Sequence, residues 1–406
     1  MSHAKATTMS CRRRPRTVAL AALAALAASA GAAAGAQAQT PTGAVAADWL
    51  AASTTSATGK LLGADVTLSG SRITTAEGGA VLDGRSTYFA SSAFSPALPK
   101  SDMMQVFGPA AGSSTVYSYA LSFRQPVTDP ILHIGSLAAK LELPGTTATK
   151  RSGTIQVSAT TTGTTVSSLP LSSNPSSVPP DADGTIRLSG TFGSGANGHR
   201  PITLKTSTPP WGNWASDGIL IQVAAPVTCT DWLAAGASTA DGTLPGRTVK
   251  ITRAPSPLQL YPLSFGTQVN GSWPGFGAAF YSPVLPASDV IHMVGPRDPG
   301  VRYQYTIDIR EALNGLPRVT RAILNIGSLA SAIEFATPTS VTPLSREGAA
   351  FDVTPSSVRA ILSSGQSDVG GSVMLSPAST IKFDILNPDR SFVQEDGIYL
   401  QVCAVA

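Results

Sequence analysis

The sequence predicts an all-β protein built from two tandem antiparallel β-sandwich domains of the jelly-roll kind. Only 13% of its 406 residues are charged, whereas 38 Gly and 31 Pro supply turns. Typical soluble domains carry about 25% charged residues. Short runs rich in Thr and Val between the turns are typical of strands. This composition excludes a coiled coil, a helical bundle and a charge-driven disordered chain.

The first 38 residues have the features of a secretory signal peptide. Arg12–Arg16 form a basic start, residues 18–35 are almost all apolar, and Ala36-Gln37-Ala38 matches a cleavage site. We expect cleavage after Ala38 and a secreted protein; the alternative is an N-terminal membrane anchor. Without this leader, 23 basic and 24 acidic residues remain. That balance predicts no nucleic-acid partner, and no later stretch is apolar enough to span a membrane.

The rest of the chain contains one set of motifs twice, in the same order. DWLAA at 48–52 recurs at 231–235, the FSPALPKSD motif at 94–102 recurs as YSPVLPASD at 281–289, and ILHIGSL at 131–137 recurs as ILNIGSL at 323–329. The copies are offset by 179 to 192 residues, which is long enough for a domain with its own core. We therefore predict a signal peptide at 1–38, repeat 1 at 44–225, repeat 2 at 228–406, and a very short linker at 224–227.

Each repeat contains many short segments of β character. Residues 301–309 alternate apolar and polar side chains, as a half-buried strand does. The best helical candidates are 53–60 and 310–316, and Ser/Thr/Pro-rich runs at 160–168 and 172–180 are expected to be loops. In repeat 1 we expect strands at 61–68, 116–123, 131–134, 140–143, 154–159, 185–188, 202–205 and 219–223.

An opening segment with Trp and a closing Asp-Gly-Ile strand occur in both repeats. In these features the chain resembles tandem jelly-roll modules of secreted bacterial surface and carbohydrate-binding proteins. The resemblance covers both repeats but rests on short motifs. It implies an extracellular binding role and identifies no ligand.

Two cysteines remain after the leader, Cys229 and Cys403. They fall in the first and last strands of repeat 2, which can lie side by side in a sandwich. Export favours a disulfide between them. Ala46 and Ala224 stand at the matching positions of repeat 1, so the fold itself does not need the bridge. Two buried free thiols are the alternative.

Catalytic signals are weak. The three histidines of the mature chain, His133, His199 and His292, are not shared between the repeats, although a duplicated active site would be expected to keep its general base. The serines of the two IGSL motifs, Ser136 and Ser328, lack a nucleophile-elbow context. Carboxylates shared by both copies leave a glycan hydrolase as the alternative; they are Asp48/Asp231, Asp102/Asp289, Glu142/Glu334, Asp217/Asp396 and Asp181/Asp368. We expect no enzyme activity.

Asp181-Ala182-Asp183-Gly184 alternates carboxylates ahead of a Gly, as part of a calcium loop does. We expect a solvated turn here and no cofactor, with a structural calcium ion on Asp181 and Asp183 as the alternative. Asp217 and Asp396 each precede a Gly and are expected to lie in a tight turn before the last strand of their repeat.

The five tryptophans fall into two groups. Trp49 and Trp232 match between the repeats and are predicted to pack in the core. Trp211, Trp214 and Trp273 have no counterpart and are placed in loops, where exposed rings could bind sugars; the alternative is that they plug the domain ends or the seam between the domains. The sequence thus predicts a secreted, non-catalytic protein that binds polysaccharide or a cell-surface component. The alternatives are an extracellular glycan hydrolase with acidic catalytic residues and a structural matrix component.

Overall fold

The computed structural model describes residues 42–74, 81–110, 112–170, 181–194, 199–208, 217–236, 238–254, 268–285, 288–296, 298–311, 319, 321–363, 366, 368–387 and 397–405. Within these ranges the regular structure is almost entirely strand, with short 3-10 turns and no α-helix. The all-β prediction is therefore confirmed. The turns are η1 (Tyr88–Ala90), η3 (Gly275–Gly277) and η4 (Gly348–Ala350).

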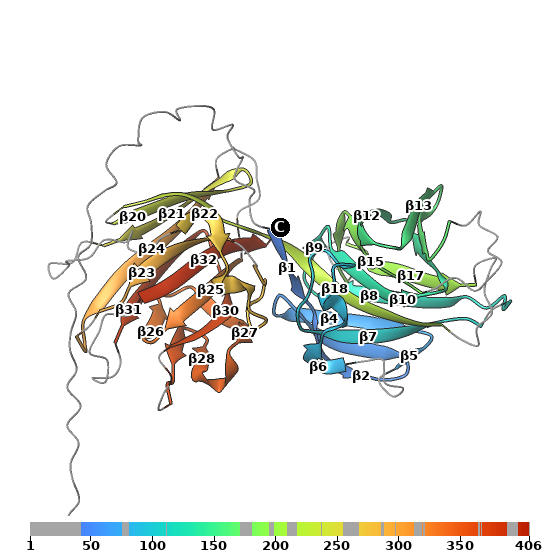
Figure 1. The fold of residues 1–406 in the computed structure, drawn as a ribbon, viewed down its shortest axis with the longest axis horizontal. Coiled ribbons are helices and arrows are strands. Elements are labelled where there is room, and N and C mark those ends of the chain that lie inside the picture. Colours follow the sequence, from blue (N-terminus) through green and yellow to red (C-terminus); the bar gives the residue numbers. More distant parts are fainter. Residues whose placement is uncertain are drawn as a thin grey trace, which may run out of the picture. The chain divides into compact units, whose positions relative to one another are not determined.

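Repeat 1 forms two layers of antiparallel strands (Figure 1). One layer runs in the order β12 (Thr147–Gly153), β15 (Ala182–Ser189), β10 (Ile131–Leu137), β18 (Asp217–Cys229) and β7 (Ser101–Gly108), with β5 (Ile73–Thr74) and β6 (Val81–Ser86) on β7. The other runs β13 (Gln156–Thr160), β14 (Gly163–Ser167), β11 (Lys140–Pro144), β17 (Ile202–Ser207), β8 (Tyr117–Phe123), β4 (Ala64–Gly70), β3 (Ser56–Leu61) and β2 (Asp48–Ala52). β9 (Val127–Thr128) pairs with β16 (Thr191–Phe192).

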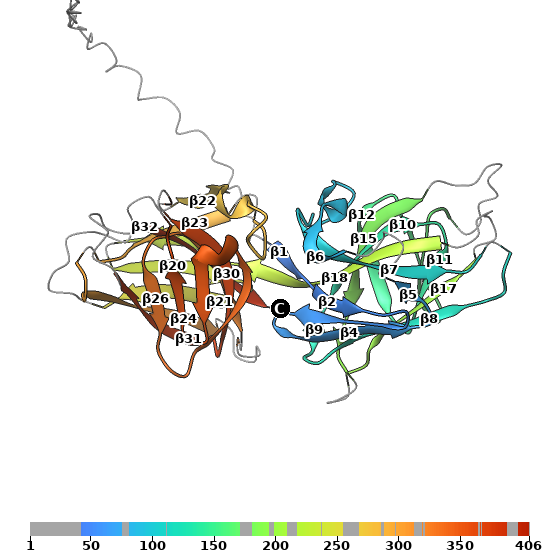
Figure 2. The same cartoon turned by 90° about the horizontal axis from the view of Figure 1, so that it is seen from below.

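Repeat 2 has the same strand order (Figure 2). Its first layer runs β27 (Ser340–Arg346), β30 (Val369–Ser376), β25 (Ala322–Leu329), β32 (Gly397–Val405), β23 (Ser288–Val294) and β22 (Gln268–Trp273). Its second runs β28 (Phe351–Thr354), β29 (Ser357–Ala360), β26 (Ala332–Phe335), β31 (Thr380–Leu386), β24 (Arg302–Glu311), β21 (Arg247–Arg253), β20 (Thr239–Leu244) and β19 (Asp231–Ala235). Every one of these strands therefore has a positional counterpart in repeat 1.

Strand β18 closes repeat 1 and opens repeat 2. Residues 224–227, expected to be a linker, lie inside this strand. The opening strand β1 (Thr42–Ala46) pairs with β18 so that Ala46 is opposite Ala224. In repeat 2, the end of β18 pairs with β32 so that Cys229 is opposite Cys403, and a disulfide joins them. The two alanines predicted to match the cysteines therefore occupy the same paired positions in repeat 1.

Two local predictions were wrong. Residues 56–60 belong to β3 rather than to a helix, because Gly59 lets the backbones approach so closely that a Cβ there would lie 2.3 Å from the carbonyl oxygen of Asp48. Residues 163–167 form β14 rather than a loop, and Val166 of this strand is fully buried. The second helical candidate was 310–316. Its first two residues, Arg310 and Glu311, end strand β24, and 312–316 lie outside the described residues. The predicted loop at 172–180 also lies outside them.

Side chains from both layers fill the core of each repeat. Trp49 and Trp232 are 1% and 0% exposed, as predicted. The alternation predicted over 301–309 is confirmed, because Tyr303, Tyr305 and Ile307 in β24 are buried and the residues between them are more exposed. Burying such large apolar side chains stabilises a fold by about 1.5–3 kcal/mol each.

Candidate functional site

The tryptophan of the repeated DW motif is anchored by a buried polar cluster. In repeat 1, the backbone N–H of Trp49 donates to Asp102 Oδ2 at 2.6 Å, and its indole Nε1–H donates to Gln222 Oε1 at 2.9 Å. The Gln222 amide donates to the carbonyls of Ala47 and Asp102. Trp232, Asp289, Gln401 and Thr230 make the same four contacts in repeat 2. This Trp–Gln–Asp cluster holds the opening segment of each repeat to the opposite sheet.

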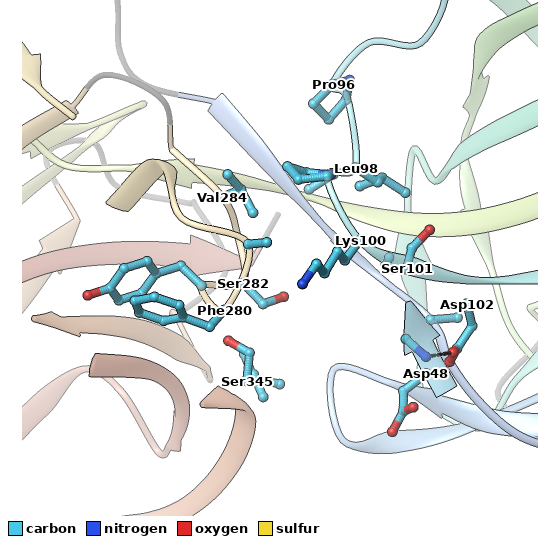
Figure 3. A pocket seen from close by; sticks show the side chains of 18 of the residues that line it. Asp48, Pro96, Leu98, Lys100, Ser101, Asp102, Phe280, Ser282, Val284 and Ser345 are labelled. Atoms are coloured by element: carbon cyan, nitrogen blue, oxygen red, sulfur yellow. Dashed lines mark hydrogen bonds between the residues drawn. The ribbon is translucent and has the colours of Figure 1, made fainter. Parts of the chain in front are cut away.

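The main role of the Asp102 carboxylate is therefore structural, because it accepts the backbone N–H of Trp49. It is 2% exposed, and its Oδ1 accepts the backbone N–H of Gly84, the hydrogen bond dashed in Figure 3. The pKa of Asp102 is raised to about 6, mainly by burial and to a smaller extent by the neighbouring carboxylate of Asp48, while the hydrogen bonds from Gly84 and Trp49 oppose the shift. Asp48 itself is exposed. These two acids adjoin each other, which spacing in the sequence could not show.

Asp217 is also held in the fold. It is the first residue of strand β18 and is buried, rather than lying in a tight turn before the strand as expected. Its Oδ2 accepts the backbone N–H groups of Ala138 and Ala139. Burial raises its pKa to about 6 against these two hydrogen bonds, with a smaller contribution from Asp181. Its counterpart Asp396 lies outside the described residues. The last shared acids, Glu142 and Glu334, form surface ion pairs with Lys140 and Arg302.

The serines of the two IGSL motifs sit at matching β-bulges. Ser136 and Ser328 have φ values of 53° and 55°, in the left-handed region that costs energy for a residue with a Cβ. Their hydroxyls donate to Asp181 and Asp368, each at 2.6 Å. A serine that donates to an exposed carboxylate fixes a bend in the strand. Among the residues with described positions, neither serine has a histidine as a hydrogen-bond partner.

The predicted calcium ligands are engaged within the protein. Asp181 accepts from Ser136, while Asp183 accepts the Tyr88 hydroxyl at 2.8 Å and the Ser136 backbone N–H at 2.9 Å. Residues 182–184 begin strand β15 rather than forming a solvated turn. In the part of the chain that the structure describes, no group of three or more His, Cys, Asp or Glu side chains is arranged to hold a metal ion.

His133 supports a loop. Its Nδ1 lies 2.9 Å from the Thr185 hydroxyl, which accepts the backbone N–H of Ser95. Burial, and then the charge of Arg151, lowers the pKa of His133 to about 3, so the ring is neutral. Repeat 2 replaces this pair with Asn325 and Ser372, which hold the backbone of Ser282 and Pro283. His292 packs against Tyr399, and His199 is partly buried near Gly193.

Of the three tryptophans predicted to bind sugar, only Trp273 lies among the described residues. Trp211 and Trp214 lie outside the described residues. Trp273 is not in a loop as expected, because it ends strand β22 and pairs with Ser288. The prediction that these three rings bind a ligand stays a prediction.

A groove of about 460 Å³ is lined by both copies of the repeated Ser-Pro-x-Leu-Pro motif. Repeat 1 contributes 96–102, and repeat 2 contributes Phe280, Ser282 and neighbouring residues. Figure 3 shows the Lys100 amine reaching from the first loop toward the wall that carries Ser282 and Phe280. The groove was not predicted, because it is formed by segments about 180 residues apart.

The groove combines charges, hydroxyls and a ring. Lys100, Arg346 and Asp48 are exposed, and Phe280 is half-buried. Three hydroxyl residues, Ser101, Ser282 and Ser345, also line the groove. One sequence signal was available: Lys100 is the only charge in which the two SPxLPxSD motifs differ, since Ala287 stands at its place in repeat 2. Phe280 precedes the motif and carries no comparable signal.

No helix among the described residues is long and apolar enough to cross a membrane. No protein-family model matches the chain, and no curated protein matches it in sequence.

Three solved structures are similar over most of the chain. The tandem CBM32-1 and CBM32-2 domains of ZmpB from Clostridium perfringens are 7% identical, with 82% of this chain and 94% of that chain covered and a TM-score of 0.16. The coconut allergen cocosin is 8% identical (90% and 85% covered, TM-score 0.14). The recombinant pro-11S globulin of pumpkin is 10% identical (74% and 84%, TM-score 0.11). Identities and TM-scores this low assign neither a family nor a ligand.

Proposed function

We propose that this chain is a secreted, non-catalytic protein that binds an extracellular polysaccharide or another cell-surface component in the groove between the two repeated loops. The composition of the groove carries the proposal. A sugar presents apolar ring faces and hydroxyl groups, so an aromatic side chain beside charged and hydroxyl hydrogen-bonding groups suits it. Phe280, Lys100 and Asp48 provide such a set. The volume of about 460 Å³ lies within the range of ligand pockets, roughly 300–1,000 Å³.

The engagement of the shared acids supports a non-catalytic role. Asp102, Asp217 and Asp289 accept backbone N–H groups that hold strands together. His133, the most buried histidine, is neutral and bonded to Thr185. Groups committed to the fold in this way are poor candidates for proton transfer.

One observation favours the glycan hydrolase as a second candidate. Asp48 and Asp102 both line the groove, and the raised pKa of Asp102 is what a general acid needs. Two geometric facts weigh against it. Asp102 is 2% exposed and both of its oxygens accept backbone N–H groups. The two carboxyl groups also adjoin each other, whereas retaining glycosidases hold theirs about 5–5.5 Å apart and inverting ones farther.

The test is binding of purified residues 39–406 to neutral and charged polysaccharides and to cell-envelope fractions, measured by affinity electrophoresis with and without a calcium chelator. We expect retention on at least one polymer and no effect of the chelator. Lys100→Ala, which installs the residue of repeat 2, and Phe280→Ala should each weaken binding about tenfold, equivalent to about 1.4 kcal/mol. Lys382→Ala removes an exposed lysine and Ile361→Ala an exposed large apolar side chain elsewhere, and both variants should bind as the parent does.

Equal binding by the groove variants and the controls would refute the groove as the site. Release of reducing ends that is abolished by Asp48→Asn would replace the proposal with the hydrolase. The secreted state is tested separately, by N-terminal sequencing of the exported protein, which should begin at Gln39.

A further inference from the structure

A second cavity, of about 330 Å³, lies on repeat 1 beside the start of β1 and the end of β18. Its lining consists of Gly43, Ser95, Pro96, Ile131, Arg151, Arg187, Pro226, Val227 and Thr228. Among the lining residues that the structure describes, the charged ones are two arginines and none is a carboxylate. The whole chain after the leader is nearly neutral, so this is a local concentration of positive charge.

The two arginines are not equally compensated. Arg187 Nη2 lies 2.7 Å from Asp129 Oδ2. The Arg151 side chain makes no hydrogen bond or ion pair with any residue that the structure describes. Partial burial, and then the positive charge of Arg187, lowers the pKa of Arg151. The two arginines carry two positive charges, and the carboxylate of Asp129 compensates only one of them. A bound anion would compensate the remaining charge.

A local irregularity of the backbone sets the direction of the Arg151 side chain. The residue is the extra one in a β-bulge of β12, where the register with β15 shifts between Lys150 and Ser152. A bulge redirects the side chain of its extra residue away from the regular alternation of the strand. Arg187 lies on the neighbouring strand, opposite Thr149.

Repeat 2 shows that the fold does not require these arginines. Leu344 occupies the matching bulge of β27, between Pro343 and Ser345, and Met374 stands opposite Thr342 as Arg187 stands opposite Thr149. Both residues pack against apolar side chains. The same backbone positions therefore accept uncharged side chains in one repeat and carry two guanidinium groups at an open cavity in the other.

We infer that the cavity at Arg151 and Arg187 binds an oxyanion of an acidic polysaccharide, a carboxylate or sulfate group on a sugar unit. Guanidinium groups bind such planar or tetrahedral oxyanions through paired N–H donors. The hydroxyls of Ser95 and Thr228 in the lining offer further hydrogen bonds. This inference rests on the proposed polysaccharide-binding function and specifies its ligand class.

The test compares polygalacturonate, dextran sulfate and neutral dextran as ligands of residues 39–406, measured by isothermal titration calorimetry at low and high salt. We expect binding to at least one acidic polymer that is at least about tenfold tighter than binding to neutral dextran and that weakens as salt rises. Arg151→Leu, which installs the residue of repeat 2, should remove most of this preference. Arg359→Leu removes an equal charge from exposed strand β29 and should keep it. The polymer that binds more tightly shows whether the carboxylate or the sulfate is preferred.

Two results would overturn the inference. In the first, Arg151→Leu binds acidic polymers as tightly as Arg359→Leu does. In the second, neutral dextran binds as tightly as the acidic polymers, with sensitivity to Lys100→Ala and Phe280→Ala; the proposed function would then stand while the anion site fails. Absence of binding to every polymer would count against both. Far-ultraviolet circular dichroism of each variant shows that it is folded.

Discussion

Repeats 1 and 2 share one strand order and one buried Trp–Gln–Asp cluster, but they differ in the side chains that line cavities and in the presence of a buried disulfide. Trp49 and Trp232 are held by the same set of hydrogen bonds. In contrast, Arg151 and Arg187 of repeat 1 correspond to Leu344 and Met374. Both repeats therefore keep the hydrogen bonds of the Trp–Gln–Asp cluster, whereas the side chains at the matching bulge positions differ in charge.

The loop support shows how different side chains can fill one structural role. His133 and Thr185 hold the backbone of Ser95 in repeat 1, whereas Asn325 and Ser372 hold that of Ser282 in repeat 2. Both pairs place a hydroxyl where it accepts the serine N–H. Only the histidine adds a titrating group, so the two repeats should respond differently to acid.

The largest expected effect comes from the disulfide, the covalent link present in one repeat only. Replacing Cys229 and Cys403 together with Ala should lower the free energy of unfolding by about 4–5 kcal/mol, the chain-entropy value for a loop of this length; the two cysteines are 174 residues apart. Urea denaturation of residues 39–406 measures the change.

The converse experiment adds a disulfide to repeat 1. Ala46→Cys combined with Ala224→Cys should form a second disulfide, because these residues are paired as the natural cysteines are. Thiol titration of the denatured protein measures it. Two free thiols in the oxidised variant would show that the repeats are not equivalent at this position.

The next effect tests whether the Trp–Gln–Asp clusters are equivalent. Gln222→Leu and Gln401→Leu each leave a buried indole N–H and two backbone carbonyls without their partner. Each should lower the free energy of unfolding by about 3 kcal/mol, since each unsatisfied buried group costs about 1–3 kcal/mol. Urea denaturation compares both with Gln304→Leu, which is exposed and should change little. A large loss in only one repeat would break the equivalence.

Asp217 should make the fold less stable as the pH rises. Its pKa is raised from 3.8 to about 6 in the folded protein, so its contribution is complete below pH 3.8 and is lost as the pH rises through 6. Asp217→Asn can still accept both N–H groups and does not ionise. Above pH 7 it should exceed the parent in free energy of unfolding by up to about 3 kcal/mol.

Urea denaturation between pH 3.5 and 8 measures this difference. Asp241→Asn, at an exposed ion pair, serves as the control. If the difference between Asp217→Asn and the parent is the same at every pH, Asp217 does not titrate in this range.

The smallest effect separates the two loop supports. The pKa of His133 falls from 6.5 to about 3 in the fold, so its contribution is present above pH 6.5 and is lost as the pH falls toward 3. His133→Asn, which installs the residue of repeat 2, should remove this loss. At pH 5 its gain relative to pH 7.5 should be up to about 2 kcal/mol, measured by urea denaturation at both values. His199→Asn is the control, and an equal change in both variants would refute the assignment.

Much of the architecture could be predicted because the sequence presents it twice. The duplicated motifs located Trp49 and Trp232, and the match of Ala46 and Ala224 with the cysteines is reproduced in the strand register. The helix expected at 53–60 failed because local composition does not show that Gly59 lies against another strand.

The candidate sites were harder to predict. Gln222 and Gln401 were not singled out, although an identical polar residue inside an apolar strand of both copies was a usable signal. Lys100, Phe280 and Arg151 could not be recognised as candidate site residues, because the residues that line the cavities with them are distant in the sequence. Their cavities depend on the strand pairing and on a bulge, neither of which a single sequence encodes locally.

The central claim, that the repeated loops form a ligand groove, is tested most directly by hydrogen–deuterium exchange of residues 39–406 with and without a retained polysaccharide. We expect slower exchange at 96–102 and 279–284 when the polymer is bound. Protection confined to the tryptophan-containing segment 209–216, with both loops unchanged, would contradict it.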